Sequence, residues 1–170
     1  MMARANPTLA LRPMLPADAP LLAEIFRASI EELTADDYSD AQREAWAAAA
    51  DDVAAFGARL AGQLTLVATL DGAPVAFASL KGADGIDMLY VHPAAAAQGA
   101  ASLLLDALEK LAAARGAARL TVDASDSAQD FFLRRGFALV QRNTVSCGGE
   151  WLANTTMHKT LAAPAAGGKQ

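Results

Sequence analysis

Residues 96–102 combine a glycine with the expected start of a helix, a pattern that could bind an anion. The first N–H groups of a helix have no acceptor within it, and the helix dipole adds partial positive charge there. Gly99 has no Cβ, so a phosphate can approach its backbone closely. The residues of this turn are Ala96, Ala97, Gln98, Gly99, Ala100, Ala101 and Ser102. Plain strand-to-helix connections that bind nothing show the same pattern, and both interpretations stay open.

A strand before the turn and a long helix after it must position these N–H groups. Residues 86–92 predict the strand, and Pro93 ends it because proline has no N–H to donate to a ladder. In residues 99–115 the leucines and alanines recur on one helical face, which predicts an amphipathic helix. Gly116 then supplies the left-handed residue that favours a helix end.

Further strands and helices surround this unit. Residues 64–70 and 74–80 predict a hairpin, with Asp71-Gly72 at its turn. The crossover through the long helix makes strand 119–123 parallel to strand 86–92. We expect other elements at 8–14, 19–33, 40–46, 52–61, 127–135, 137–147 and 150–159. The order predicts an α/β (α+β) fold with a mixed, mostly antiparallel sheet.

Composition limits the class of protein. The chain has 170 residues, of which 54% are hydrophobic, with one cysteine and a net charge of −5. We divide it into a flexible start at 1–7, a single domain at 8–161 and a disordered tail at 162–170. One cysteine excludes an internal disulfide framework, and no apolar stretch or export signal stands out, so we expect a cytoplasmic protein. The negative charge argues against nucleic acid and membrane partners and suits a cationic amine.

Four segments in order resemble the GNAT N-acetyltransferase family over roughly residues 9–161. Val91-His92-Pro93 is similar to its V-x-P segment, and Gln98-Gly99-Ala100-Ala101 to its pyrophosphate-binding turn. Residues 128–137 resemble its A-x-x-F-(Y/F)-x-(K/R)-x-G-F segment, and residues 145–159 resemble the end of a bacterial subgroup. The resemblance implies a twisted sheet of about seven strands, splayed central parallel strands and about four helices.

The same resemblance implies that acetyl-CoA binds as cosubstrate, with its pantetheine between the two splayed strands. The backbone groups of Leu89, Tyr90 and Val91 would then hold the pantetheine and the acetyl carbonyl. Two positions depart from the family. Ala96 replaces a polar residue of the turn, and Phe132 replaces a tyrosine that protonates the departing thiolate in many relatives. Phe132 would still contact the cofactor.

Acetyl transfer to an amine needs a base, donors for the oxyanion and a proton for the thiolate. Asp87 is our first choice of base, or it is only an exposed aspartate near a strand end. Asp123 is a second candidate, the binder of a substrate cation, or a residue that caps the loop before Ala124. Tyr90 could act as acid or pack in the core, and alternation places it opposite Asp87 unless a bulge intervenes. Arg134 and Arg135 could reach phosphates or only complement a helix dipole.

Tyr38 and Trp46 lie in the segment that covers the acceptor pocket in acetyltransferases of this type, so they could contact substrate or only pack. We expect a small-molecule or peptide amine as partner and no metal, and a homodimer stays open. The first hypothesis is an acetyl-CoA-dependent N-acetyltransferase. The second is a catalytically weak acyl-CoA-binding or regulatory module of the same fold, and the third is an unrelated α/β protein whose turn binds nothing.

Overall fold

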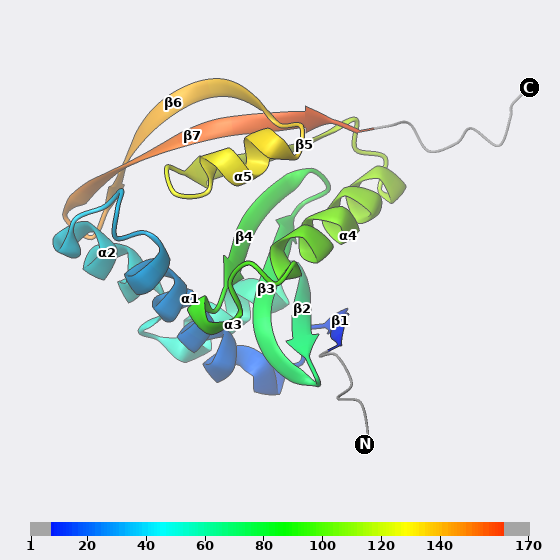
Figure 1. Cartoon of the computed structure of the whole chain (residues 1–170), viewed down its shortest axis with the longest axis horizontal. Helices are drawn as coiled ribbons and strands as arrows, with labels where there is room; N and C mark the ends of the chain where they lie inside the picture. Colours follow the sequence, from blue (N-terminus) through cyan, green and yellow to red (C-terminus); the bar gives the residue numbers. More distant parts are fainter. Residues whose placement is uncertain (1–7, 162–170) are drawn as a thin grey trace, which may run out of the picture.

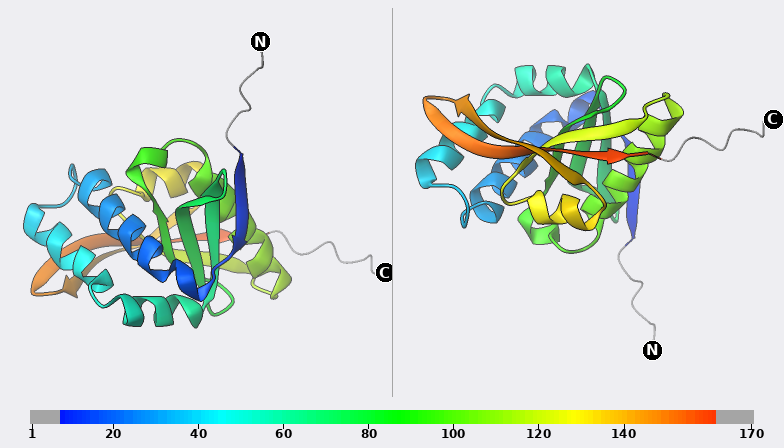
Figure 2. Two further views of the ribbon diagram at one scale, coloured as in Figure 1. Left: turned by 90° about the horizontal axis from the view of Figure 1, so that it is seen from below. Right: turned by 90° about the horizontal axis from the view of Figure 1, so that it is seen from above.

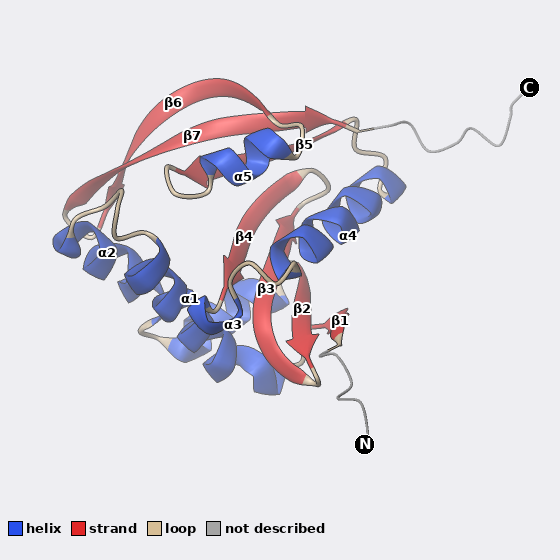
Figure 3. Cartoon of the chain, in the orientation of Figure 1, coloured by secondary structure: helices blue, strands red, loops and turns tan. Residues whose placement is uncertain are grey.

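A seven-stranded sheet in the order β1-β2-β3-β4-β5-β7-β6 runs through the molecule (Figures 1 and 3). The computed structural model describes residues 8–161, so our expectations for 1–7 and 162–170 lie outside the described residues. The strands are β1 Leu9–Pro13, β2 Leu64–Leu70, β3 Ala73–Lys81, β4 Gly85–Val91, β5 Arg119–Ser125, β6 Ala138–Cys147 and β7 Glu150–Thr160. The helices are α1 Ala19–Leu33, α2 Asp40–Ala47, α3 Val53–Ala61, α4 Ala100–Ala114 and α5 Gln129–Arg134.

Helices cover both faces of the sheet (Figure 2). On one face α1 and α3 pack a core that includes Phe26, Leu60 and Phe77 against the strands. On the other face α4 and α5 pack a second core, in which Leu104 and Leu108 are fully buried. The apolar spacing of residues 99–115 therefore produces the helix that it predicts, with α4 sealing one side of the sheet.

The β2–β3 hairpin forms at the predicted turn. Asp71 and Gly72 both have positive φ, at 52° and 87°, as a two-residue turn between twisted strands requires. Residues 8–161 form five α-helices, close to the five ranges expected from the sequence and one more than the family resemblance implies. The short 3-10 turn Ala48–Ala50 separates α2 from α3, and Asp52 caps the latter. No helix among residues 8–161 is both long and apolar enough to cross a membrane.

The two central parallel strands are joined at one end only. Gly85 pairs with Thr121 and Ile86 with Val122, and β4 and β5 separate beyond these two pairs (Figure 1). Antiparallel pairing joins β5 to β7 over its whole length and β4 to β3 on its other edge. The predicted splayed, mostly antiparallel sheet is confirmed, and the backbone of β4 after Ile86 faces an opening rather than a strand.

Candidate active site

The turn before α4 leaves its N–H groups available to a ligand. Ala97 has φ of 64° and Gly99 has φ of 90°, so two left-handed residues reverse the chain just before the helix. Within residues 8–161, the backbone N–H groups of 97–102 have no backbone acceptor, whereas the N–H of Leu103 donates to the carbonyl of Gly99. A row of free donors at a helix N-terminus suits a phosphate.

A cavity of about 470 Å³ opens at this turn. Of the seven predicted turn residues, Gln98 alone does not line it, and its side chain is exposed. Arg134 and Arg135 from the end of α5 also reach the cavity. The Arg135 guanidinium donates to Ser102 Oγ and lies 5.3 Å from the centre of the Phe131 ring. Two cations and the free N–H groups therefore meet at one place.

A narrower channel of about 160 Å³ leads from this cavity into the molecule. It shares Leu33, Val91, Ala101 and Phe131 with the cavity at the turn. At its inner end it meets a third cavity of about 300 Å³, which lies where β4 and β5 have separated. The residues that line both the channel and this inner cavity are Trp46, Leu89, Tyr90, Ser125, Ala128 and Phe132. These shared residues make the three spaces neighbours, and we call the row of three the groove.

The inner cavity collects every residue proposed above for catalysis or substrate contact. Asp87 and Tyr90 come from β4, Asp123 comes from β5, and Tyr38 and Trp46 come from the segment after α1. The hairpin of β6 and β7 supplies one wall that sequence reasoning did not assign, with Ser146, Cys147, Leu152 and Asn154 among its residues. Although residues 145–159 carry part of the family resemblance, nothing in their types or spacing indicated that they line the cavity.

A β-bulge decides where Asp87 points. Ser79 pairs with Met88 and Leu80 pairs with Ile86, so Asp87 is an extra residue in β4. Ile86 consequently packs in the core beneath α4, whereas Met88 packs in the core beneath α1. Asp87 lies on the α1 and α3 side of the sheet, the same side as Tyr90, so the bulge removes the opposition that simple alternation predicts.

The Asp87 carboxylate is held by three N–H donors. Arg59 donates from Nε at 3.0 Å and from Nη2 at 2.9 Å, and Gln63 Nε2 donates at 2.9 Å. Burial raises the pKa of Asp87, but these hydrogen bonds outweigh burial and the pKa lies below its usual value. A carboxylate with a lowered pKa and occupied lone pairs is a weak base, although it keeps its negative charge beside the cavity.

Asp123 is the less restrained carboxylate of the two. It is exposed and accepts one hydrogen bond, from Thr156 Oγ1 at 2.6 Å. Thr156 in turn accepts from Asn143, which also donates to Asn154 on the cavity wall. A hydrogen-bonded row on β6 and β7 thus fixes the wall beside Asp123, and the carboxylate keeps lone pairs for a cationic ligand.

Tyr90 connects the inner cavity to a cluster of aromatic rings in the core. The Tyr90 ring centre lies 4.7 Å from that of Phe26, 5.8 Å from that of Phe77 and 6.3 Å from that of Trp46. Burial raises the pKa of the Tyr90 phenol, so the hydroxyl is neutral at physiological pH. Tyr90 therefore packs in the core along its ring and borders the cavity as well.

Tyr38 ties three separate segments together. Its hydroxyl donates to the carbonyl of Ala153 at 2.6 Å and accepts from the N–H of Asp126 at 2.9 Å. Its ring centre lies 5.3 Å from that of Trp46. Burial raises the pKa of Tyr38, so the hydroxyl keeps the proton that it donates. The residue is buried and holds Trp46 and the segment after α1 over the cavity.

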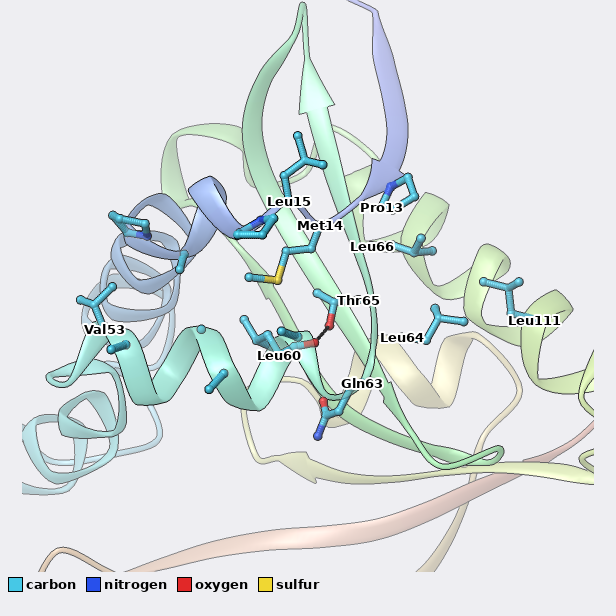
Figure 4. A pocket seen from close by; sticks show the side chains of 17 residues that line it. Pro13, Met14, Leu15, Val53, Leu60, Gln63, Leu64, Thr65, Leu66 and Leu111 are labelled. Carbon is cyan, nitrogen blue, oxygen red and sulfur yellow. Dashed lines mark hydrogen bonds between the residues drawn. The ribbon is translucent and has the colours of Figure 1, made fainter.

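A larger hollow of about 960 Å³ lies elsewhere, beside α3 and the edge of β1 and β2 (Figure 4). Its lining is mostly apolar, and the Thr65 hydroxyl in it donates to the carbonyl of Leu60 at 2.7 Å. Carboxylates, free N–H groups and arginines converge in the groove between β4 and β5 and not in this hollow, so size does not identify the site. Within residues 8–161 no cluster of His, Cys, Asp and Glu could hold a metal.

Comparison with known proteins decides the family. Residues 34–161 match the sequence model described as acetyltransferase (GNAT) domain. The chain belongs to the GNAT acetyltransferase family. An uncharacterised N-acetyltransferase of Escherichia coli K12, YafP, is 36% identical over 147 residues, which cover 86% of this chain and 93% of YafP.

Solved GNAT structures share the fold. A GCN5-related N-acetyltransferase from Rhodopseudomonas palustris is 65% identical and superposes with a TM-score of 0.89, covering 95% of this chain and 99% of that one. The PaiA N-acetyltransferase of Thermoplasma acidophilum, solved with coenzyme A, is 19% identical with a TM-score of 0.74, covering 90% of this chain and 99% of that one. The second likeness concerns the fold alone.

Proposed function

We propose that this GNAT protein transfers the acetyl group of acetyl-CoA to a primary amine of a small molecule or peptide. The observation that carries the proposal is the row of three adjoining cavities that we call the groove. It begins at the free N–H groups and arginines before α4 and ends at a cavity with two carboxylates. A diphosphate suits the first end and a cationic amine suits the second.

Different residues of the groove bind different parts of acetyl-CoA. The N–H groups of 97–102 with Arg134 and Arg135 bind the diphosphate, and the unpaired edge of β4 offers Leu89, Tyr90 and Val91 as hydrogen-bonding partners to the pantetheine. PaiA was solved with coenzyme A and the Salmonella typhimurium YncA with acetyl-CoA, which supports such a ligand here.

Asp123 holds the incoming ammonium, and Asp87 lines the same cavity with its charge paired to Arg59. The amine loses a proton to Asp123 or to cavity water, and its nitrogen attacks the thioester carbonyl directly. The C–N bond forms, the C–S bond breaks, and the thiolate takes the electron pair. We replace our first choice of base, Asp87, by Asp123, because Arg59 and Gln63 occupy the Asp87 lone pairs.

A catalytically weak acyl-CoA-binding module is the second candidate. Phe132 favours it, because this buried ring borders the junction of channel and cavity and has no hydroxyl to donate. The same groove would then bind acetyl-CoA and release it unchanged.

Two measurements separate these functions. Thermal shift and calorimetry with acetyl-CoA test binding, and thiol release over a panel of primary amines, including peptides with a free N-terminus, tests transfer. Stabilisation with amine-dependent thiol release supports the acetyltransferase. Stabilisation without thiol release across the panel favours the binding module, and an unchanged melting temperature with no heat of binding rejects both.

A further inference from the structure

We propose that Tyr90 is the residue that protonates the departing thiolate, with Trp46 as the residue that positions its phenol. The inference rests on the proposed acetyl transfer and assigns a step that the function leaves open. Tyr90 lines both the channel and the inner cavity, so it borders the point where a thioester in the channel meets an amine in the cavity.

Few side chains at this junction have a proton to give. Leu89, Ala128 and Phe132 have none, and Trp46 has only its weakly acidic indole N–H. Ser125 accepts from the N–H of Ala128 at 3.1 Å, and an alcohol is a far weaker acid than a phenol. The phenol of Tyr90 is thus the most acidic donor that borders both spaces.

Three neighbouring hydroxyl groups donate their protons to other acceptors. Tyr38 donates to the carbonyl of Ala153 at 2.6 Å, and Ser127 donates to Asp37 at 2.7 Å. Thr34, which lines the channel, donates to the carbonyl of Ile30. Using any of these protons would break a hydrogen bond that holds the covering segment in place.

The surroundings of Tyr90 suit a proton donor. Phe26 and Phe77 pack against its ring at centre distances of 4.7 and 5.8 Å, which fixes the ring plane. The Trp46 ring packs edge-on against it at a centre distance of 6.3 Å. Phenylalanine has no acceptor and an indole N–H can only donate, so these rings leave the phenol proton available to the groove.

The step balances without another reagent. When the C–S bond breaks, the sulfur takes the electron pair, and Tyr90 transfers its proton to sulfur and becomes a phenolate. The proton that the attacking amine releases to Asp123 or to cavity water returns through water to the phenolate. The products are the acetylated amine and the free thiol, and Tyr90 is restored.

Tyr90→Phe keeps the ring and removes the proton. The kcat for thiol release should fall by about 100-fold or more, as loss of a general acid does, while the acetyl-CoA Kd changes by less than about threefold. Trp46→Phe should lower kcat by about three- to tenfold, because the phenol loses the larger ring that packs against it, and should leave the KM for acetyl-CoA unchanged.

Rescue separates acid chemistry from packing. In the double variant Tyr90→Phe/Phe132→Tyr a hydroxyl enters the same junction from α5, and kcat should be at least about tenfold higher than that of Tyr90→Phe. A Tyr90→Phe kcat within about threefold of wild type overturns the assignment. So does a lower kcat that comes with a weaker acetyl-CoA Kd and a lower melting temperature, because the loss would then reflect packing. Wild-type protein that releases no thiol with any amine overturns the proposed function itself, and this inference with it.

Discussion

Replacing Gly99 by alanine tests whether the turn before α4 grips a diphosphate. Gly99 has φ of +90°, and a Cβ there would meet nothing nearer than Leu9 Cδ1 at 3.9 Å. The substitution therefore adds backbone strain without a steric clash. A residue with a Cβ in a left-handed conformation costs about 1–2 kcal/mol. The loop can relieve this strain only by turning the N–H groups that follow Gly99 away from their present direction.

Acetyl-CoA affinity should fall by as much as that strain, about 1–2 kcal/mol, which is roughly 5–30-fold in Kd. Isothermal titration calorimetry measures it directly. Gly116→Ala is the matched control, because Gly116 has φ of +87° at the far end of α4 and open space around its Cβ position. The control should lose a similar free energy of unfolding and keep the wild-type Kd.

Two results would refute this reasoning. If Gly99→Ala unfolds as easily as Gly116→Ala yet binds acetyl-CoA with the wild-type Kd, the N–H groups of the turn do not hold the diphosphate. If both variants weaken binding equally, the loss comes from a less stable α4 and says nothing of the turn.

Two further predictions concern buried or paired carboxylates. Hydrogen bonds from Arg12 lower the pKa of Asp18, whose side chain is 9% exposed, so its stabilisation is present above about pH 4 and is lost as pH falls through the lowered pKa. Asp18→Asn should cost about 1–2 kcal/mol of unfolding free energy at pH 7, and this cost should shrink as the pH falls below about 4, measured by urea denaturation. Asp87→Asn should lower kcat about tenfold through lost charge while the acetyl-CoA Kd changes by less than about threefold; steady-state rates with calorimetry check this, and an unaltered kcat would contradict it.

The strand, turn and helix of residues 86–116 are predicted well, because interactions between residues close in the sequence determine them. Pro93 ends the strand, the apolar face defines α4, and Gly116 with φ of +87° follows the last turn. The divergence of β4 from β5 came from family resemblance and not from periodicity. From the alternation of apolar and polar residues alone, we would have expected these two parallel strands to pair along their whole length.

The side-chain contacts of the site escaped the sequence because they join distant residues. Arg59 precedes Asp87 by 28 positions, and Tyr38 bonds to groups 88 and 115 positions away. The bulge at Asp87 depends on its register with β3, since neither strand carries a glycine or proline at that point. Only the three-dimensional packing reveals that Asp87 is already paired.

Because only two residue pairs link β4 to β5, the sheet consists of two parts, β1–β4 and β5–β7, that are joined at one end. The first part leads into the turn before α4, whereas the second part supplies much of the wall of the inner cavity. Antiparallel ladders hold each part together separately, so substitutions in the β6–β7 hairpin can change the wall of the cavity while β1–β4 keep their register. If the protein is the proposed acetyltransferase, substitutions in β6 and β7 should therefore change which amines it accepts while the turn before α4 keeps its geometry.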